Sequence, residues 1–151
     1  MFDVLVIGAG VSGVSCALVL GSAHNKPYAA DKNIAIIAHQ KASSLQNAVF
    51  NNAYGIPAGK LGSEILLESL AQLQNLYPHV AQIEGEKVHS ILGEAGNFTI
   101  ITNKSNFQAK IIVVTIGPNN PFLIEGLEAF VEPHQKIPPA KNRIQLRNND
   151  H

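Results

Sequence analysis

Three glycines near the start of the chain constrain its fold more than any other feature. Gly8, Gly10 and Gly13 follow the short apolar segment 2–8 and open a second apolar stretch over residues 11–20. In a strand–G-x-G-x-x-G–helix arrangement, the first glycine permits a tight turn, the second admits a pyrophosphate close to the backbone, and the third lets helix and strand pack closely. The helix N-terminus supplies free N–H groups and a positive dipole end. The pattern predicts a dinucleotide-binding turn, with a purely structural glycine turn as the alternative.

A second apolar segment completes the unit around these glycines. Residues 33–40 read NIAIIAHQ and predict another strand that is buried on both faces. The helix between the two strands is expected to end at Gly21 and Ser22, just before a polar loop that contains a proline. Strand, helix and strand within about forty residues predict one right-handed β-α-β unit.

The acidic residue that usually accompanies such a turn is missing. An Asp or Glu is expected at the end of the second strand, where it meets the adenosine ribose. The sequence at that point is instead Ala38, His39, Gln40 and Lys41. His39 or Gln40 can hydrogen-bond a ribose, and His39 with Lys41 can meet a 2′-phosphate. The alternative is that these are solvated residues at a strand end.

The middle of the chain holds an irregular stretch and then a helix. Residues 41–62 are rich in Asn, Ser, Ala and Gly and are too long for a simple connector, so they predict either a binding loop or a poorly ordered segment. Residues 63–78 predict an amphipathic helix, with Ser63 as its cap and Pro78 at its end. One face of this helix carries leucines at helical spacing: Leu66, Leu70 and Leu73.

Three short strands follow the helix. They are predicted over residues 87–94, 97–104 and 107–117, and residues 94–97 (EAGN) resemble a hairpin turn. The third segment loses its alternation at IIVVTIG, so we expect it to return to the buried parallel sheet. The predicted class is α/β and Rossmann-like, with a central parallel sheet and a small antiparallel β-meander.

Composition indicates one packed domain and disfavours several classes of partner. The 151 residues are 46% hydrophobic and 15% charged, which favours a substantial core. Lys plus Arg equals Asp plus Glu, at 11 each, so there is no basic excess for nucleic acid. Asp3 and the glycines are unlike a secretory leader, and the apolar run is too short to span a bilayer, so no membrane partner is expected. A single cysteine favours a cytoplasmic protein.

Other candidate motifs do not indicate chemistry. Cys16 lies between Ser15 and Ala17 on the predicted helix and is interpreted as core packing. Segment 55–61 is not a P-loop, because its glycine spacing is wrong and Leu61 replaces the Mg²⁺-binding Ser or Thr. The histidines show no metal-ligand spacing, so no metal site is predicted. Catalytic residues stay unassigned.

Three segments in order resemble the FAD-binding domain of the thioredoxin-reductase-like pyridine nucleotide-disulfide oxidoreductases. They are VIGAGVSG after the first strand, NNAYGIPAGKLGSEILLESL in the middle, and AKIIVVTIG in the last strand. In addition, EGEKVHSI falls where the family has a strand whose backbone meets the adenine. The resemblance covers most of residues 2–127. It implies a three-layer FAD/NAD(P)-binding fold, with FAD as the cofactor and NAD(P)H as a candidate reductant.

The resemblance also implies a set of cofactor-binding residues. The pyrophosphate would be held by the three glycines and the backbone of their neighbours: Gly8, Ala9, Gly10, Val11, Ser12 and Gly13. Asn52 matches an asparagine on the flavin side, and Val88 matches the adenine contact. The family's Ala-Thr-Gly stretch corresponds to Thr115, Ile116 and Gly117, with Thr115 in place of Ala and Ile116 in place of Thr.

The chain departs from the family in several respects. Besides the missing acid, it has no second G-x-G-x-x-G for an NAD(P)H domain, no Cys-x-x-Cys and no C-terminal Gly-Asp segment. We expect residues 1–127 to form the FAD/NAD(P)-binding domain and residues 128–151 to be an irregular segment of the same domain or its truncated end. The chain is then either a truncated piece or a minimal relative.

These observations leave three functional hypotheses. The first is a FAD-dependent oxidoreductase, or a fragment of one, whose partner is a small-molecule dinucleotide. The second is a non-catalytic or degenerate dinucleotide-binding domain. The third is an NAD(P)-dependent dehydrogenase, which the strand-rich stretch 88–117 disfavours because a two-halved Rossmann domain alternates helices and strands there. Substrate, electron acceptor and oligomeric state stay open.

Overall fold

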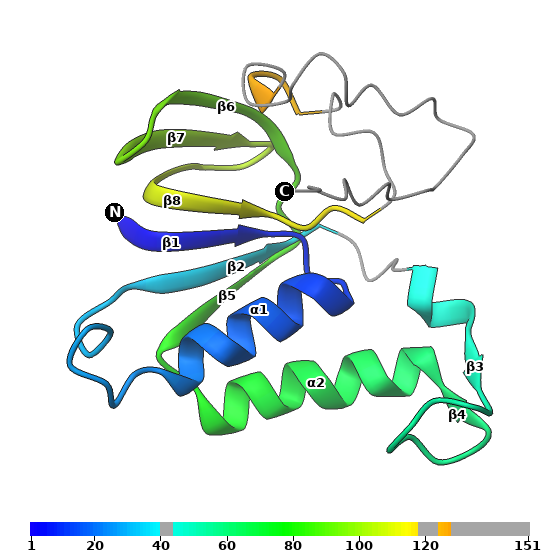
Figure 1. The fold of residues 1–151 in the computed structure, drawn as a ribbon. Helices are drawn as coiled ribbons and strands as arrows, with labels where there is room; N and C mark the ends of the chain where they lie inside the picture. The colour runs from blue at the N-terminus through cyan, green and yellow to red at the C-terminus, as the bar shows by residue number, and fades with distance from the viewer. Residues whose placement is uncertain (40–43, 118–123, 128–151) are drawn as a thin grey trace, which may run out of the picture.

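The computed structural model describes residues 1–39, 44–117 and 124–127 (Figure 1). Its main sheet has the strand order β5-β2-β1-β8-β7-β6, and β3 pairs with β4 in a separate hairpin. In chain order the elements are β1 (Phe2–Ile7), α1 (Val11–Ser22), β2 (Ile34–Ala38), the 3-10 helix η1 (Ser44–Asn47), β3 (Val49–Phe50), β4 (Lys60–Leu61), α2 (Gly62–Leu76), β5 (Val80–Glu84), β6 (Val88–Glu94), β7 (Asn97–Thr102) and β8 (Asn106–Val114).

Strand β1 lies at the centre of the parallel part of the sheet. It pairs in parallel with β2 on one side and with β8 on the other, and β5 adds a parallel edge beside β2. Alternate residues of β1 enter two different cores: Val6 faces the helices, whereas Leu5 and Ile7 face the opposite layer. Both faces of the strand are therefore covered, as its continuous apolar sequence predicts.

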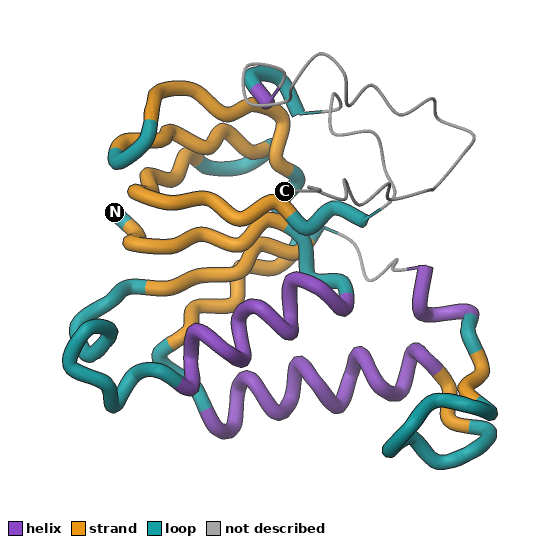
Figure 2. The backbone as a smooth tube through the Cα atoms, in the orientation of Figure 1, coloured by secondary structure: helices purple, strands orange, loops and turns teal. Residues whose placement is uncertain are grey.

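Helices α1 and α2 cover one face of the parallel strands (Figures 1 and 2). Leu66 is buried and Leu70 is partly buried, so the predicted leucine face of α2 is confirmed. The core on this side combines both helices with three strands: Val6, Val14, Ala17, Ile34, Ile36, Leu73 and Val80.

The meander packs on the other face. Residues 106–109 of β8 pair antiparallel with β7, and residues 109–114 pair in parallel with β1. Figure 2 shows β8 bending back on itself between these two stretches. The second core lies between the layers and includes Leu5, Ile7, Ala35, Ile37, Ile91, Phe98, Ile100 and Ala109. Helices, parallel sheet and meander make three layers, so the predicted Rossmann-like class is confirmed.

Helix α1 ends at Ser22, as predicted, and Gly21 in its last turn is buried against Tyr77, where a β-carbon would lie 2.8 Å from the Tyr77 Cβ. The predicted cap of α2 is wrong. Ser63 lies inside α2 and does not cap it. The N-cap is Leu61, whose N–H donates to a carboxylate oxygen of Glu64 at 3.3 Å.

The sequence also left two structured segments unassigned. Strand β5 was not predicted, because Gln82 and Glu84 interrupt its apolar pattern. Within 41–62, the described residues form η1 and the β3–β4 hairpin, whereas residues 40–43 lie outside the described residues. In the part of the chain that the structure describes, no helix combines the length and the hydropathy needed to cross a membrane.

Candidate dinucleotide-binding site

The glycine turn lies at the carboxyl end of β1, at the centre of the parallel strands. The Gly8 N–H donates to the Ile37 carbonyl oxygen in β2 at 2.9 Å. Gly8 has φ +107°, a backbone conformation that residues with side chains rarely adopt. Gly10 is the N-cap of α1, and no side-chain hydrogen bond caps that helix among the described residues. No capping side chain from the described part of the chain therefore covers the backbone of this turn at the sheet edge where open α/β sheets bind ligands.

The third glycine is required by close packing. Gly13 is buried, and a β-carbon there would lie 1.8 Å from the Gly8 carbonyl oxygen and 2.6 Å from Thr115 Oγ1. At Gly8, a β-carbon would lie 2.6 Å from the Thr115 carbonyl oxygen. Neither position has room for any side chain, which is the arrangement that the G-x-G-x-x-G pattern predicts for close helix–strand packing.

Thr115 joins the glycine turn to the end of β8. Its N–H donates to the Ile7 carbonyl oxygen at 2.8 Å, and its hydroxyl lies 2.8 Å from the Gly8 carbonyl oxygen and 3.0 Å from that of Ile7. The next two residues differ in environment: Ile116 packs against the meander-side core, whereas Gly117 is exposed with φ +73°. The sequence indicated Thr115 only through the family resemblance, and no local pattern signals its hydroxyl contact with the turn.

The first turn of α1 suits an anion. Val11 and Ser12 are exposed, Ala9 is partly buried on the helix-side core, and the first turn carries no acidic side chain. The N-terminal N–H groups and the positive end of the helix dipole thus attract negative charge with no carboxylate from that turn competing for them.

The end of β2 borders the same edge of the sheet. His39 directly follows β2 and is exposed, and Gln40 lies outside the described residues. The Ala38 carbonyl oxygen accepts a hydrogen bond from the Gly85 N–H at 2.7 Å, so the turn after β5 is attached to this strand end. The structure therefore places His39, at the position of the missing acid, next to the segment that leads into β6.

Val88 begins β6, three residues after Gly85. Its side chain is buried in the meander-side core, and it pairs with Thr102 in the antiparallel ladder between β6 and β7. Just before it, Glu86 is buried and accepts hydrogen bonds from the hydroxyls of Thr102 and Ser105. Sequence reasoning missed Glu86, and the only available signal was an acid directly before the predicted strand 87–94.

Asn52 lies in the loop of the β3–β4 hairpin and is exposed. In this loop the Gly59 N–H donates to Asn51 Oδ1 at 3.1 Å and to the Phe50 carbonyl oxygen at 2.8 Å. Figure 1 shows the hairpin beyond the first turn of α2 and apart from the start of α1. The structure thus brings the glycine turn, His39, the start of β6 and the end of β8 to one edge of the sheet, and it holds Asn52 on a separate arm.

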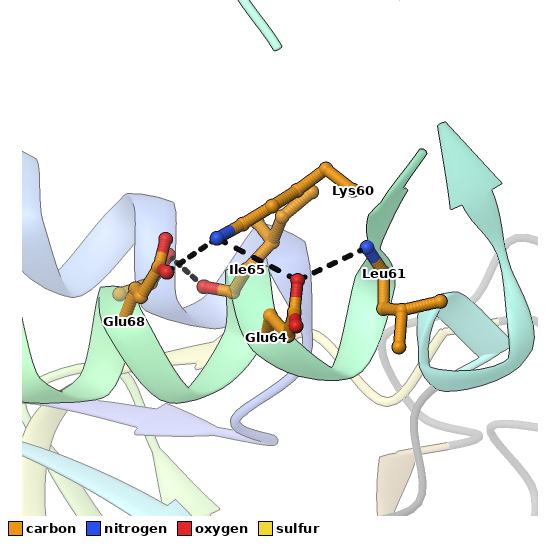
Figure 3. Close-up of polar contacts among 6 residues, drawn as sticks. Lys60, Leu61, Glu64, Ile65 and Glu68 are labelled. Atoms are coloured by element: carbon orange, nitrogen blue, oxygen red, sulfur yellow. Dashed lines mark hydrogen bonds and ion pairs between the residues drawn. The ribbon is translucent and has the colours of Figure 1, made fainter. Parts of the chain in front are cut away.

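A lysine fixes this arm to α2 (Figure 3). Lys60 Nζ lies 2.5 Å from Glu68 Oε1 and 3.6 Å from Glu64 Oε2. The hydrogen bond from Lys60 to Glu68 raises the pKa of the lysine. Glu64 also accepts the Leu61 N–H, so the same two turns of α2 hold both residues of β4.

Cys16 lies in α1 and contributes packing. It is partly buried against the helix-side core, in agreement with the sequence interpretation, and burial raises the pKa of its thiol. A raised pKa lowers the thiolate fraction at neutral pH, which is the reverse of what a reactive cysteine requires.

The fold and the glycine turn together define a Rossmann-like domain. No protein-family model matches the chain. The ferredoxin–NADP reductase of Lactococcus lactis subsp. cremoris (strain SK11) is 30% identical over 117 residues, which are 76% of this chain and 35% of the reductase.

Solved structures give the same result. The oxidoreductase from Agrobacterium tumefaciens superposes with a TM-score of 0.64 and 26% identity, over 77% of this chain and 36% of that one. Thioredoxin reductase from T. acidophilum gives a TM-score of 0.62 and 28% identity, over 77% and 35%. Over most of its length the chain is therefore similar to thioredoxin reductases and ferredoxin–NADP reductases, which confirms the resemblance found in the sequence. It spans about a third of the length of the relatives it matches.

Proposed function

We propose that the chain binds FAD at the turn between β1 and α1 and forms part of a flavin-dependent oxidoreductase with NAD(P)H as reductant. The contact of Gly13 with the Gly8 carbonyl oxygen carries this proposal, since it packs the start of α1 directly against the end of β1, as the G-x-G-x-x-G turn of a dinucleotide site requires. Relatives that are named as reductases support the redox class. The FAD/NAD(P)-binding domain would correspond to residues 1–127.

The residues at the sheet edge fit the parts of a dinucleotide. In this proposal the pyrophosphate is held by the backbone of the turn, which comprises Gly8, Ala9, Gly10, Val11, Ser12 and Gly13. The Val88 backbone meets the adenine. His39, with Gln40, takes the place of the ribose acid. Residues 115–117 lie on the flavin side. Asn52, on the separate β3–β4 arm, is assigned to the flavin side by the family resemblance alone.

The chain's own contribution is binding and orientation. FAD, when bound, supplies hydride and electron transfer through its isoalloxazine. Gly8 and Gly13 let α1 pack against the end of β1, and Thr115 holds the turn against β8. The first turn of α1 offsets the negative charge of the diphosphate with its N–H groups. We assign no acid–base residue.

The absorbance spectrum of the purified protein, with and without added FAD, tests this proposal. We expect bound flavin with quenched fluorescence, and bleaching of the flavin band on addition of NADPH if the protein also accepts that reductant. Colourless protein that shows no binding in a FAD titration would falsify the cofactor assignment. Flavin that binds but is not bleached would leave FAD binding standing and remove the reductase activity from the chain itself.

The ligand that the protein binds distinguishes two other candidate functions from this proposal. An NAD(P)-dependent dehydrogenase is disfavoured because β6, β7 and β8 form a meander where a second Rossmann half would alternate helices and strands. A degenerate domain is favoured only by His39 at the acid position. Thermal shift with NADH, NADPH and FAD distinguishes the three, since a tight ligand raises the melting temperature by mass action. The cytoplasmic location stays a prediction from the sequence.

A further inference from the structure

A buried carboxylate holds the turn between β5 and β6. Glu86 is 8% exposed, and its two carboxylate oxygens accept hydrogen bonds from two different hydroxyls. Thr102 donates to Oε2, and Ser105 donates to Oε1 at 3.0 Å. Among the described residues, no lysine, arginine or histidine nitrogen forms an ion pair with it. Burying a carboxylate costs free energy unless hydrogen bonds compensate. The local fold therefore depends strongly on these two hydrogen bonds.

The hydroxyl of Thr102 is itself held in place. Its oxygen accepts the N–H of Ser105 at 2.9 Å and the N–H of Lys104 at 3.2 Å, within the turn between β7 and β8. Its single proton is shared between Glu86 and the Ser105 carbonyl oxygen at 2.9 Å, and the Glu86 oxygen is the nearer of the two acceptors. The donors are thus oriented by the fold before any ligand binds, as an effective positioning contact requires.

The turn that carries Glu86 is also bonded on both sides through its backbone. The Gly85 N–H donates to the Ala38 carbonyl oxygen at 2.7 Å, at the end of β2. The Lys87 N–H donates to Asn103 Oδ1 at 2.7 Å, and the Asn103 N–H donates to the Lys87 carbonyl oxygen at 3.0 Å. Residues 85–87 therefore bridge the end of β2 and the β7–β8 turn, with the Glu86 carboxylate as the buried centre of the bridge.

We propose that Glu86 is a positioning residue for the adenosine half of the bound dinucleotide, acting through the backbone from Gly85 to Val88. This inference rests on the proposed function. The turn borders the end of β2, where the chain has His39 and not an acid, so the backbone that faces the adenosine has no ribose carboxylate from β2 to help it. The recognition of adenosine by this backbone then depends on the position of the β5–β6 turn, which Glu86 fixes.

Glu86→Ala tests the inference, with Glu94→Ala as the matched control. Glu94 is an exposed glutamate in the same meander, at the hairpin between β6 and β7. We expect Glu86→Ala to weaken the binding of FAD and of ADP at least tenfold, to leave the binding of FMN within twofold, and to speed hydrogen exchange at the Gly85 amide. The control should leave all four measurements unchanged. Glu86→Gln, which keeps one carbonyl acceptor and the side-chain shape, should restore part of the ADP affinity.

A milder variant guards against loss of folding. Thr102→Val removes one hydroxyl donor with little change of shape, and we expect a smaller loss of ADP affinity in the same direction. Unchanged ADP affinity and unchanged Gly85 exchange in both variants would overturn the inference while leaving FAD binding intact. A uniform loss of FAD, ADP and FMN binding would also overturn it, because the effect would then be general. A wild-type protein that binds neither FAD nor ADP overturns the proposed function as well.

Discussion

The α-carbon of Gly13 packs directly on the carbonyl oxygen of Gly8, so that a β-carbon on Gly13 would lie 1.8 Å from that oxygen. The same β-carbon would lie 2.6 Å from Thr115 Oγ1, and the Thr115 hydroxyl is 2.8 Å from the Gly8 oxygen. The start of α1, the end of β1 and the end of β8 thus meet at one point. The geometry of the glycine turn depends on all three segments.

Gly13→Ala should remove FAD binding. The methyl group must push α1 away from β1, which moves the N–H groups of the turn and costs about 1–3 kcal/mol of unfolding free energy. Flavin titration and urea unfolding measure the two effects. Gly21→Ala is the control: its β-carbon meets Tyr77 instead of the turn, so stability should fall while FAD affinity holds. Unchanged FAD affinity in Gly13→Ala would contradict the assigned turn.

Ser12→Asp should separate binding from stability. Ser12 is exposed in the first turn of α1. A carboxylate at that position interacts favourably with the helix dipole and stabilises the helix by about 0.3–1 kcal/mol. The same charge repels a diphosphate, so FAD affinity should drop while the melting temperature stays equal or rises. Ser15→Asp, which is exposed one turn later, serves as the control and should bind FAD almost normally. An equal effect of both variants would argue against diphosphate binding at the helix N-terminus.

Thr115→Val should loosen the turn without a change of shape. The variant loses the hydroxyl proton shared by the Gly8 and Ile7 carbonyl oxygens, and we expect a loss of about 1–3 kcal/mol because those acceptors are partly buried. Thermal melts report this loss, and hydrogen exchange at the Gly8 amide should speed up. Thr115→Ser keeps the donor and should retain most of the stability. If Thr115→Val and Thr115→Ser have the same stability and the same exchange at the Gly8 amide, the hydroxyl contact does not hold the turn.

Asp3 should contribute to the acid sensitivity of the fold. Its carboxylate accepts from Lys110 Nζ at 2.7 Å and from the Asn33 N–H at 2.9 Å, and these contacts, the lysine first, lower its pKa below the usual 3.8. A lowered pKa gives stability that is full above the unfolded-state value and is lost as the pH falls through the folded-state value. Asp3→Asn should therefore be less stable than wild type at pH 7, and the difference should disappear toward pH 2. A constant difference from pH 7 to pH 2 would contradict the ionic contact.

Cys16 should react slowly in the folded protein. Burial raises its pKa, so less thiolate is present and access is limited. At pH 8 we expect labelling by a thiol reagent to be at least tenfold slower in buffer than in denaturant. Equal rates would show that the cysteine is exposed. Cys16→Ala should keep FAD binding, as expected for a packing residue.

The sequence predicts the β1–α1–β2 unit well because its signals are local. The glycine spacing and the two apolar strands lie within one continuous segment, and the hairpin at 94–97 is likewise set by neighbouring residues. Strand β5 is not predicted because its partner strand β2 is remote in the sequence and its polar residues interrupt the apolar pattern of a buried strand.

The same contrast holds at the candidate site. The glycines are readable from the sequence, whereas Glu86 is not, because its hydroxyl partners lie 16 and 19 residues away on another turn. Gly21 marks the end of α1 in the sequence, whereas its contact with Tyr77 cannot be read from it. Contacts between distant segments, and not local propensity, decide all of these cases.

The pairing of β1 with β8 has a consequence for synthesis on the ribosome. Thr115 bonds to Ile7, which precedes it by 108 residues, and β8 is one of only two partners of β1 in the described sheet. Strand β1 therefore has one edge of unpaired backbone N–H and C=O groups until β8 has been synthesised. During this interval β1 can pair with a wrong strand, so co-translational protection of residues 2–7 should matter more for yield than the final stability of the sheet.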